Sequence, residues 1–147
     1  MLKNAMEIFH EFKNCKDTLW IYKEQECIFK SDKDVLGPLI EYIQSAVVTG
    51  DQILIMDKVM GNAAALLSIK AGATQIYSPL GSELASKTLS KYKVNWYIEQ
   101  LVPFILARNG RDMCPMEKLS LIHTPDKFYE VLKSKFNPSS NIVDKAL

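Results

Sequence analysis

QILIMDKVMGNAAALLSIKAG (52–72) is the stretch of sequence that decides the fold. It opens with a continuous apolar run, QILIM (52–56), which is typical of a strand covered on both faces, as in a parallel sheet. A helix is predicted to follow over about 58–71, rich in small residues that allow a close approach to the sheet. Gly72 stands where a glycine usually ends a helix. The stretch therefore predicts the strand-then-helix unit of an α/β protein.

The chain on both sides of this stretch continues the alternation of strands and helices. Apolar residues at strand or helix spacing, together with capping residues, set the expected elements. In chain order these are a helix over about 2–14, a hairpin of TLWIY (18–22) and ECIFK (26–30), a helix opened by Gly37-Pro38, the strand and helix above, the strand TQIYS (74–78), a helix over about 82–92 capped by Ser82, the strand VNWYIE (94–99), a short helix after Cys114-Pro115 and a last helix opened by Thr124-Pro125-Asp126. This order predicts a three-layer α/β/α sandwich with a mixed sheet. We expect a single domain over 1–136 and a loose tail over 137–147.

The composition excludes several classes of protein. The 147 residues carry 18 Lys and Arg against 17 Asp and Glu, and this net charge of +1 argues against a protein that coats nucleic acid. No apolar run approaches the roughly 20 residues of a membrane span. The first residues also lack the apolar core of a signal peptide. We therefore expect a cytoplasmic protein that binds neither nucleic acid nor a membrane.

The familiar metal and cofactor motifs are missing from the sequence. The cysteines, Cys15, Cys27 and Cys114, form no Cys-x-x-Cys pair, and the 2 histidines are too few for a three-histidine zinc site. The chain has no phosphate-binding loop, no dinucleotide-binding glycine pattern and no Gly-x-Ser-x-Gly turn. The sequence thus predicts reduced thiols, no metal and no cofactor.

The first candidate site follows the buried strand. Ligands of open α/β sheets usually bind at the carboxyl ends of strands, which here are Asp57-Lys58 and Ser78-Pro79-Leu80-Gly81. In the functional interpretation Asp57 is catalytic, and Lys58 holds an anionic or carbonyl group together with the free amides of the helix. In the structural interpretation Asp57 only caps the helix and Lys58 is solvated.

Cys114-Pro115-Met116-Glu117 is the second candidate site. Proline at the first helical position makes Cys114 the cap residue, where the helix dipole favours a thiolate. In the functional interpretation Cys114 is a nucleophile and Glu117 carries protons. In the structural interpretation Glu117 reaches back to the amide of the cap residue, as in a capping box.

Arg108, Asn109 and Arg111 precede this cysteine and are predicted to bind a ligand together with Lys58. Two guanidinium groups near a helix start form a clamp for a carboxylate or a phosphate, although arginines in loops are often only solvated. Residues 102–117 are the least regular part of the chain. We therefore expect this segment to close over the carboxyl ends of the strands.

Two blocks of the sequence resemble the signature blocks of a small prokaryotic family of unknown function with a cytidine deaminase-like fold. They are DKVMGNAAALLSIKAGATQIYS (57–78) and VPFILARNGRDMCPMEK (102–118), of which the second is the more specific, and the resemblance covers about residues 3–122. The family pattern corresponds here to Asp57, Lys58, Gly61, Arg108, Gly110, Cys114, Pro115 and Glu117. The resemblance implies a deaminase-like sandwich. The chain nevertheless lacks the His/Cys-x-Glu and Pro-Cys-x-x-Cys motifs through which such enzymes hold zinc.

Two functions stay open from the sequence. In the first, the protein is a zinc-independent hydrolase or transferase that acts on a small nucleoside-like or amino-acid-like molecule, with Cys114, Glu117 and Asp57 as catalytic residues. In the second, it is a non-catalytic ligand-binding or sensing domain that kept the fold. By analogy with deaminase-like folds, which often oligomerise, we also expect a homo-oligomer.

Overall fold

The structure is a computed structural model that describes residues 4–33, 36–46 and 50–135. Its helices and strands alternate along the chain as the sequence predicts. They are α1 (Ala5–Lys13), β1 (Leu19–Lys23), β2 (Glu26–Ser31), α2 (Gly37–Ser45), β3 (Ile53–Asp57), β4 (Val59–Met60), α3 (Asn62–Lys70), β5 (Gln75–Ser82), α4 (Glu83–Lys91), β6 (Asn95–Val102), α5 (Pro115–Ser120) and α6 (Pro125–Lys135).

The strands form one mixed sheet, in the order β2-β1-β3-β5, with β4 and β6 also paired to β5. β1 is antiparallel to β2 and to β3, whereas β3, β4 and β6 are parallel to β5. β3 and β4 pair with the same strand, through Leu54↔Gln75 and Val59↔Leu80. β3 and β4 are therefore consecutive segments along one edge of β5, and Lys58 separates them. The amide of Lys58 donates to the carbonyl of Thr18 at 3.1 Å.

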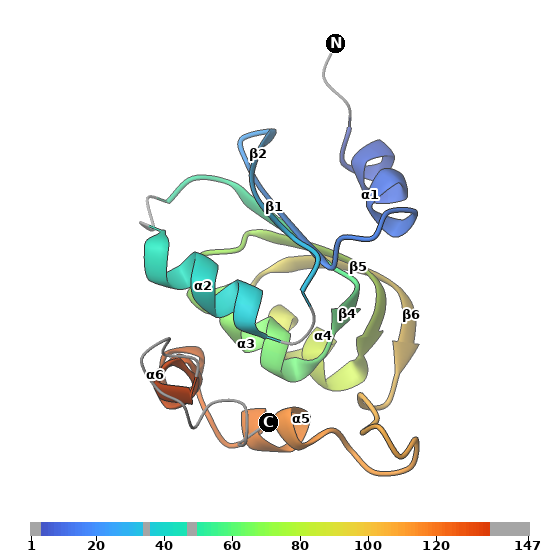
Figure 1. Cartoon of the computed structure of the whole chain (residues 1–147), viewed down its shortest axis with the longest axis vertical. Helices are drawn as coiled ribbons and strands as arrows, with labels where there is room; N and C mark the ends of the chain where they lie inside the picture. Colours follow the sequence, from blue (N-terminus) through green and yellow to red (C-terminus); the bar gives the residue numbers. More distant parts are fainter. Residues whose placement is uncertain (1–3, 34–35, 47–49, 136–147) are drawn as a thin grey trace.

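Helices cover both faces of the sheet (Figure 1). On one face lies α1, whose Phe9 and Phe12 pack against Trp20 and Met56. On the other face α2, α3 and α4 pack against the sheet, and α6 packs against α3 (Figure 1). Side chains alternate between the faces along β3, so that Ile55 joins the α3 side while Met56 joins the α1 side. The fold is thus α/β with a mixed sheet, as predicted.

Several predicted elements are present in the structure, with bounds that differ by a residue or so. The hairpin, the strand within QILIM and the helix opened by Gly37-Pro38 all form. Ser82 caps α4, because its Oγ accepts a hydrogen bond from the amide of Ala85 at 3.0 Å. The predicted short helix and the last helix start at Pro115 and Pro125.

The helix predicted over 58–71 begins later than expected. α3 starts at Asn62 with Gly61 as its N-cap, because Val59 and Met60 still pair with β5. Asp57 therefore ends a strand and does not cap this helix, which corrects the structural interpretation of that residue.

The strand predicted over 74–78 is longer than expected. β5 continues through Ser78-Pro79-Leu80-Gly81, so these residues lie within the strand and not beyond its end. Pro79 has no amide proton to donate, and it lies between the stretches of β5 that pair with β3 and with β4. The interruption at Lys58 and the proline in β5 thus fall at the same level of the sheet.

The tail expected over 137–147 lies outside the described residues, as do the first residues of the helix predicted over 2–14. In the part of the chain that the structure describes, no helix has the length and apolar character needed to cross a membrane.

Candidate functional site

A cavity of about 220 Å³ lies between α2, the junction of β3 and β4, the start of α3 and the start of α5. Asp57 and Lys58 line it from the sheet, whereas Cys114 and Glu117 line it from α5. The two sequence blocks therefore contribute to one cavity. Its other described lining residues are mostly apolar: Thr18, Leu19, Leu36, Pro38, Leu39, Val59, Gly61, Ala63, Ala64, Ile105 and Met116.

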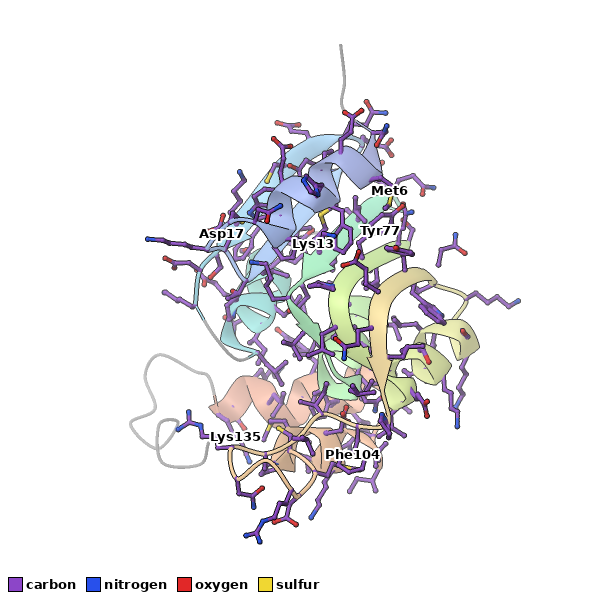
Figure 2. All side chains as sticks on the ribbon, turned by 90° about the vertical axis from the view of Figure 1, so that its right-hand side faces the viewer. Met6, Lys13, Asp17, Tyr77, Phe104 and Lys135 are labelled. Carbon is purple, nitrogen blue, oxygen red and sulfur yellow. The ribbon has the colours of Figure 1, made fainter. Side chains whose placement is uncertain are left out.

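The segment between β6 and α5 folds back on itself and brings Cys114 to the cavity. Leu106 and Met113 form an isolated antiparallel bridge, and the turn between them contains Gly110 with a φ of +74°, a conformation that favours glycine. The amide of Cys114 donates to the carbonyl of Ile105 at 2.8 Å. Figure 2 shows the loop with Phe104 labelled, at the end of the molecule opposite Met6 and next to α5.

Glu117 is the most deeply buried polar group of the site, with 2% of its surface exposed. Its Oε1 accepts a hydrogen bond from the amide of Asn62, the first residue of α3, and its Oε2 accepts one from the amide of Ile105. The hydroxyl of Ser82 lies 3.4 Å from Oε1. A carboxylate at this end of α3 also meets the positive end of the helix dipole. Both oxygens of Glu117 are thus engaged in holding the fold.

The capping-box interpretation predicted the wrong hydrogen-bond partner for Glu117. The carboxylate does not reach back to the amide of Cys114, which donates to Ile105 instead. It caps α3, a helix from another part of the chain. Gly61 makes room for this contact, because a Cβ there would lie 2.9 Å from Ile105 Cγ1 and 3.1 Å from Glu117 Oε1.

Asn62 extends this polar contact into a network that sequence reasoning missed. Its Nδ2 donates to Ser120 Oγ at 2.9 Å, and its Oδ1 accepts from the hydroxyl of Thr88. Ser120 Oγ in turn donates to the carbonyl of Glu117 at 2.6 Å. These residues lie on three different helices, so no local sequence pattern predicts their contacts. The one feature of the sequence that points to the network is a polar residue, Asn62, at the start of a helix of small apolar residues.

Asp57 differs from Glu117 in its hydrogen bonding. Its Oδ1 accepts one bond, from the amide of Val59 at 3.2 Å, and no described residue forms an ion pair with it. Burial raises the pKa of Asp57 to about 7, and the hydrogen bond from Val59 opposes this shift. Near neutral pH both the protonated and the ionised form of Asp57 are therefore populated.

Lys58 directs its ammonium group to the opposite face of the sheet. Nζ donates to the carbonyls of Cys15 at 2.7 Å and Asp17 at 2.8 Å, and it lies 4.8 Å from the centre of the Phe12 ring. The direction follows from strand alternation, because Lys58 comes two residues after Met56, which faces α1. Two of the three ammonium donors thus fix the loop between α1 and β1.

The structure does not bring Arg108, Asn109 and Arg111 into the lining of the cavity. All three are exposed. Asn109 shapes the turn instead, since its Oδ1 accepts bonds from the amides of Arg111 at 2.9 Å and Asp112 at 3.0 Å.

Within residues 4–33, 36–46 and 50–135, no group of three or more His, Cys, Asp or Glu side chains is placed to hold a metal ion. Cys114, half-buried, is one of three free cysteines. Among the described lining residues, the cavity therefore offers the thiol of Cys114 and the carboxyl group of Asp57, which accepts one hydrogen bond from a described residue.

The comparisons with known proteins place the chain in a family of unknown function, as the two sequence blocks predicted. The sequence pattern of TM1506, a domain of unknown function (DUF1893), matches residues 7–136. The chain belongs to the DUF1893 family. A crystal structure of a DUF1893 protein (TM1506) from Thermotoga maritima is similar to this chain with a TM-score of 0.75 and 30% identity, over 90% of this chain and 87% of that one. A comparison with curated proteins gives no match.

Membership of a family of unknown function was expected from the two blocks and is confirmed. The DUF1893 match extends further than expected, because it continues past residue 122 and includes α6. Phe128 and Leu132 of that helix are fully buried in the main core. In this DUF1893 protein α6 is therefore an integral part of the fold, and every polar residue of the cavity lies within the matched residues.

Proposed function

We propose that this protein binds a small molecule in the cavity and recognises it through Asp57. One observation carries the proposal: both sequence blocks line one cavity, and Asp57 there is a carboxyl group with an oxygen that accepts no hydrogen bond from a described residue. The volume of about 220 Å³ is below the roughly 300–1,000 Å³ of sites for drug-sized ligands. The ligand is accordingly small, of nucleoside-base or amino-acid size.

A catalytic role is the second candidate, and the position of Cys114 in the same cavity favours it. In this version the sulfur of Cys114 adds to the amide carbon of the ligand, and Asp57 passes the proton of the thiol to the amine that departs as the C–N bond breaks. Water then cleaves the thioester and restores the thiol. Glu117 contributes less than the sequence suggests, because both of its oxygens already accept backbone hydrogen bonds. Binding without catalysis is therefore the better supported of the two functions.

We further propose a cytoplasmic homo-oligomer whose fold is a three-layer sandwich related to the cytidine deaminases. Helices on both faces of the sheet and the two sequence blocks support this relationship. This relationship would be contradicted if a superposition showed that the order of the strands in the sheet differs from that of a cytidine deaminase. Sedimentation of the purified protein tests the oligomer.

A thermal-shift screen with nucleosides, nucleobases and amino acids tests the binding function. Val59 lies at the cavity and is 43% exposed, so Val59→Trp narrows the entrance at little cost to the core. Leu101→Trp is the matched control, because Leu101 is 42% exposed on β6 and does not line the cavity. We expect compounds that stabilise the wild type and the control but not Val59→Trp. Stabilisation that survives Val59→Trp would place the ligand elsewhere.

Product analysis on each stabilising compound then separates the two functions. Binding without product supports the non-catalytic function. Turnover that disappears in Cys114→Ser supports the enzyme.

A further inference from the structure

The charges of the described residues that line the cavity are unbalanced. Its described ionisable lining groups are Asp57, Glu117, Lys58 and the thiol of Cys114. Lys58 is the one cation among them, and its ammonium group is bonded to two carbonyls on the α1 side of the sheet. No described cation therefore balances the carboxyl groups inside the cavity.

The two carboxyl groups are not equivalent. Glu117 has backbone amides on both oxygens and faces the positive end of α3, so its charge is already compensated. Asp57 has a single amide at 3.2 Å and no ion pair with a described residue. A partly buried carboxyl group without a cationic partner is costly when it is ionised.

The walls around Asp57 are apolar. Leu19, Leu39, Val59, Ala64 and Met116 line the cavity with hydrocarbon surface. A ligand that fits these walls has an apolar body, and a ligand that compensates Asp57 brings a positive charge.

We infer that the cavity accepts a small organic cation, an amine or an amidine with an apolar body, which pairs its charged nitrogen with the carboxylate of Asp57. This inference rests on the proposed binding function of the same cavity. An anion would face the carboxylate of Asp57, and a neutral molecule would gain a hydrogen bond without the charge. A charge-assisted bond is roughly twice as strong as a neutral one.

Proton release accompanies this pairing. Burial raises the pKa of Asp57 to about 7, so the free protein carries a proton on this group in part of the population near pH 7. A bound cation favours the ionised form, and the proton leaves to solvent. The affinity for a cation should therefore rise between about pH 6 and 8.

Three probes of equal size and shape test the inference: benzamidine, benzamide and benzoate, which are cationic, neutral and anionic. Calorimetric titration of the full chain at pH 7 should give benzamidine an affinity at least about tenfold above that of benzamide, with benzoate the weakest. Repeating the benzamidine titration in buffers of different ionisation enthalpy should reveal the released proton. Asp57→Asn should remove both the preference and the proton release, while binding of benzamide stays unchanged.

The Val59→Trp and Leu101→Trp pair locates the probe in the cavity. Benzamidine binding should be lost in the first variant and kept in the second. A preference for benzamidine that survives Asp57→Asn would overturn the inference, as would equal affinities for benzamidine and benzamide. If benzamide or benzoate binds best and Val59→Trp blocks it, the cavity binds ligands but selects no cation. If none of the three binds at millimolar concentration, the inference is also wrong, and the wider compound screen still decides whether the cavity binds anything.

Discussion

Glu117, on the short helix α5, holds the backbone amide of Asn62, the first residue of α3. This single contact joins the segment after β6 to the helix that follows β4. The second oxygen of the same carboxylate holds the amide of Ile105, so the loop before α5 is fixed to the same group. One side wall of the cavity therefore depends on one buried carboxylate.

Replacing this carboxylate with an amide should destabilise the protein. In Glu117→Gln one of the two backbone donors meets an NH₂ group, and the charge at the start of α3 is lost. We expect the free energy of unfolding to fall by about 3 kcal/mol, since hydrogen bonds to charged groups contribute roughly 1.5–3 kcal/mol. Urea unfolding measures this change.

Glu130→Gln is the control for this experiment. Glu130 forms an exposed ion pair with Lys133 at 2.9 Å, so its replacement should change stability by less than about 0.5 kcal/mol. Equal effects of the two substitutions would show that the buried carboxylate of Glu117 has no special role.

Gly61 is predicted to tolerate no side chain. The Cβ of Gly61→Ala would lie 2.9 Å from Ile105 Cγ1. Overpacking of this kind lowers the free energy of unfolding by roughly 1–3 kcal/mol. Ile105→Ala removes the clashing atom. In a double-mutant cycle by urea unfolding, Gly61→Ala should therefore destabilise much less in the Ile105→Ala background. Strictly additive effects would show that Ile105 is not the source of the clash.

The sequence predicts the sheet better than it predicts the boundaries of the elements. QILIM and Ser82 identify a buried strand and a helix start because both signals are local. The start of α3 was predicted too early, because Val59 and Met60 are held by pairing with β5, which no neighbouring residue reveals.

In the site too, features set by neighbouring residues were predictable from the sequence, whereas contacts between distant residues were not. The position of Asp57 and Cys114 at one cavity was expected, because Asp57 follows a strand and the segment 102–117 was predicted to close over the carboxyl ends of the strands. The engagement of Glu117 by Asn62 does not follow, since it joins residues that are far apart in the chain. The direction of Lys58 was predictable in principle, because it continues the alternation of the strand beyond Met56.

Lys58 is predicted to stabilise the fold. Lys58→Met removes the two bonds to the carbonyls of Cys15 and Asp17 and keeps most of the apolar contact with Phe12. We expect a loss of about 2 kcal/mol in the free energy of unfolding, measured in urea. Lys87→Met, at an exposed position of α4, should change it by less than about 0.5 kcal/mol. A loss no larger than that of the control would mean that the ammonium group does not fix this loop.

Asp57 should make the stability fall as the pH rises from about 4 to 7. The folded protein keeps the proton of Asp57 up to about pH 7, whereas the unfolded chain loses it near the ordinary value of 3.8. Between these values the folded state binds more protons, so the free energy of unfolding decreases with pH and levels off above pH 7. The pKa difference corresponds to at most about 4 kcal/mol, and partial exposure of the group makes the change smaller.

Asp57→Asn isolates this contribution, because all other groups titrate equally in both proteins. The stability of the variant relative to the wild type should rise steadily between pH 4 and 7 in urea unfolding. Asp126→Asn is the control: Asp126 is exposed and pairs with Lys70 at 3.0 Å, so its replacement should change the stability by less than about 0.5 kcal/mol. A constant difference for Asp57→Asn would show that Asp57 is ionised throughout this range. The cavity would then hold a permanent negative charge, and cation binding there would release no proton.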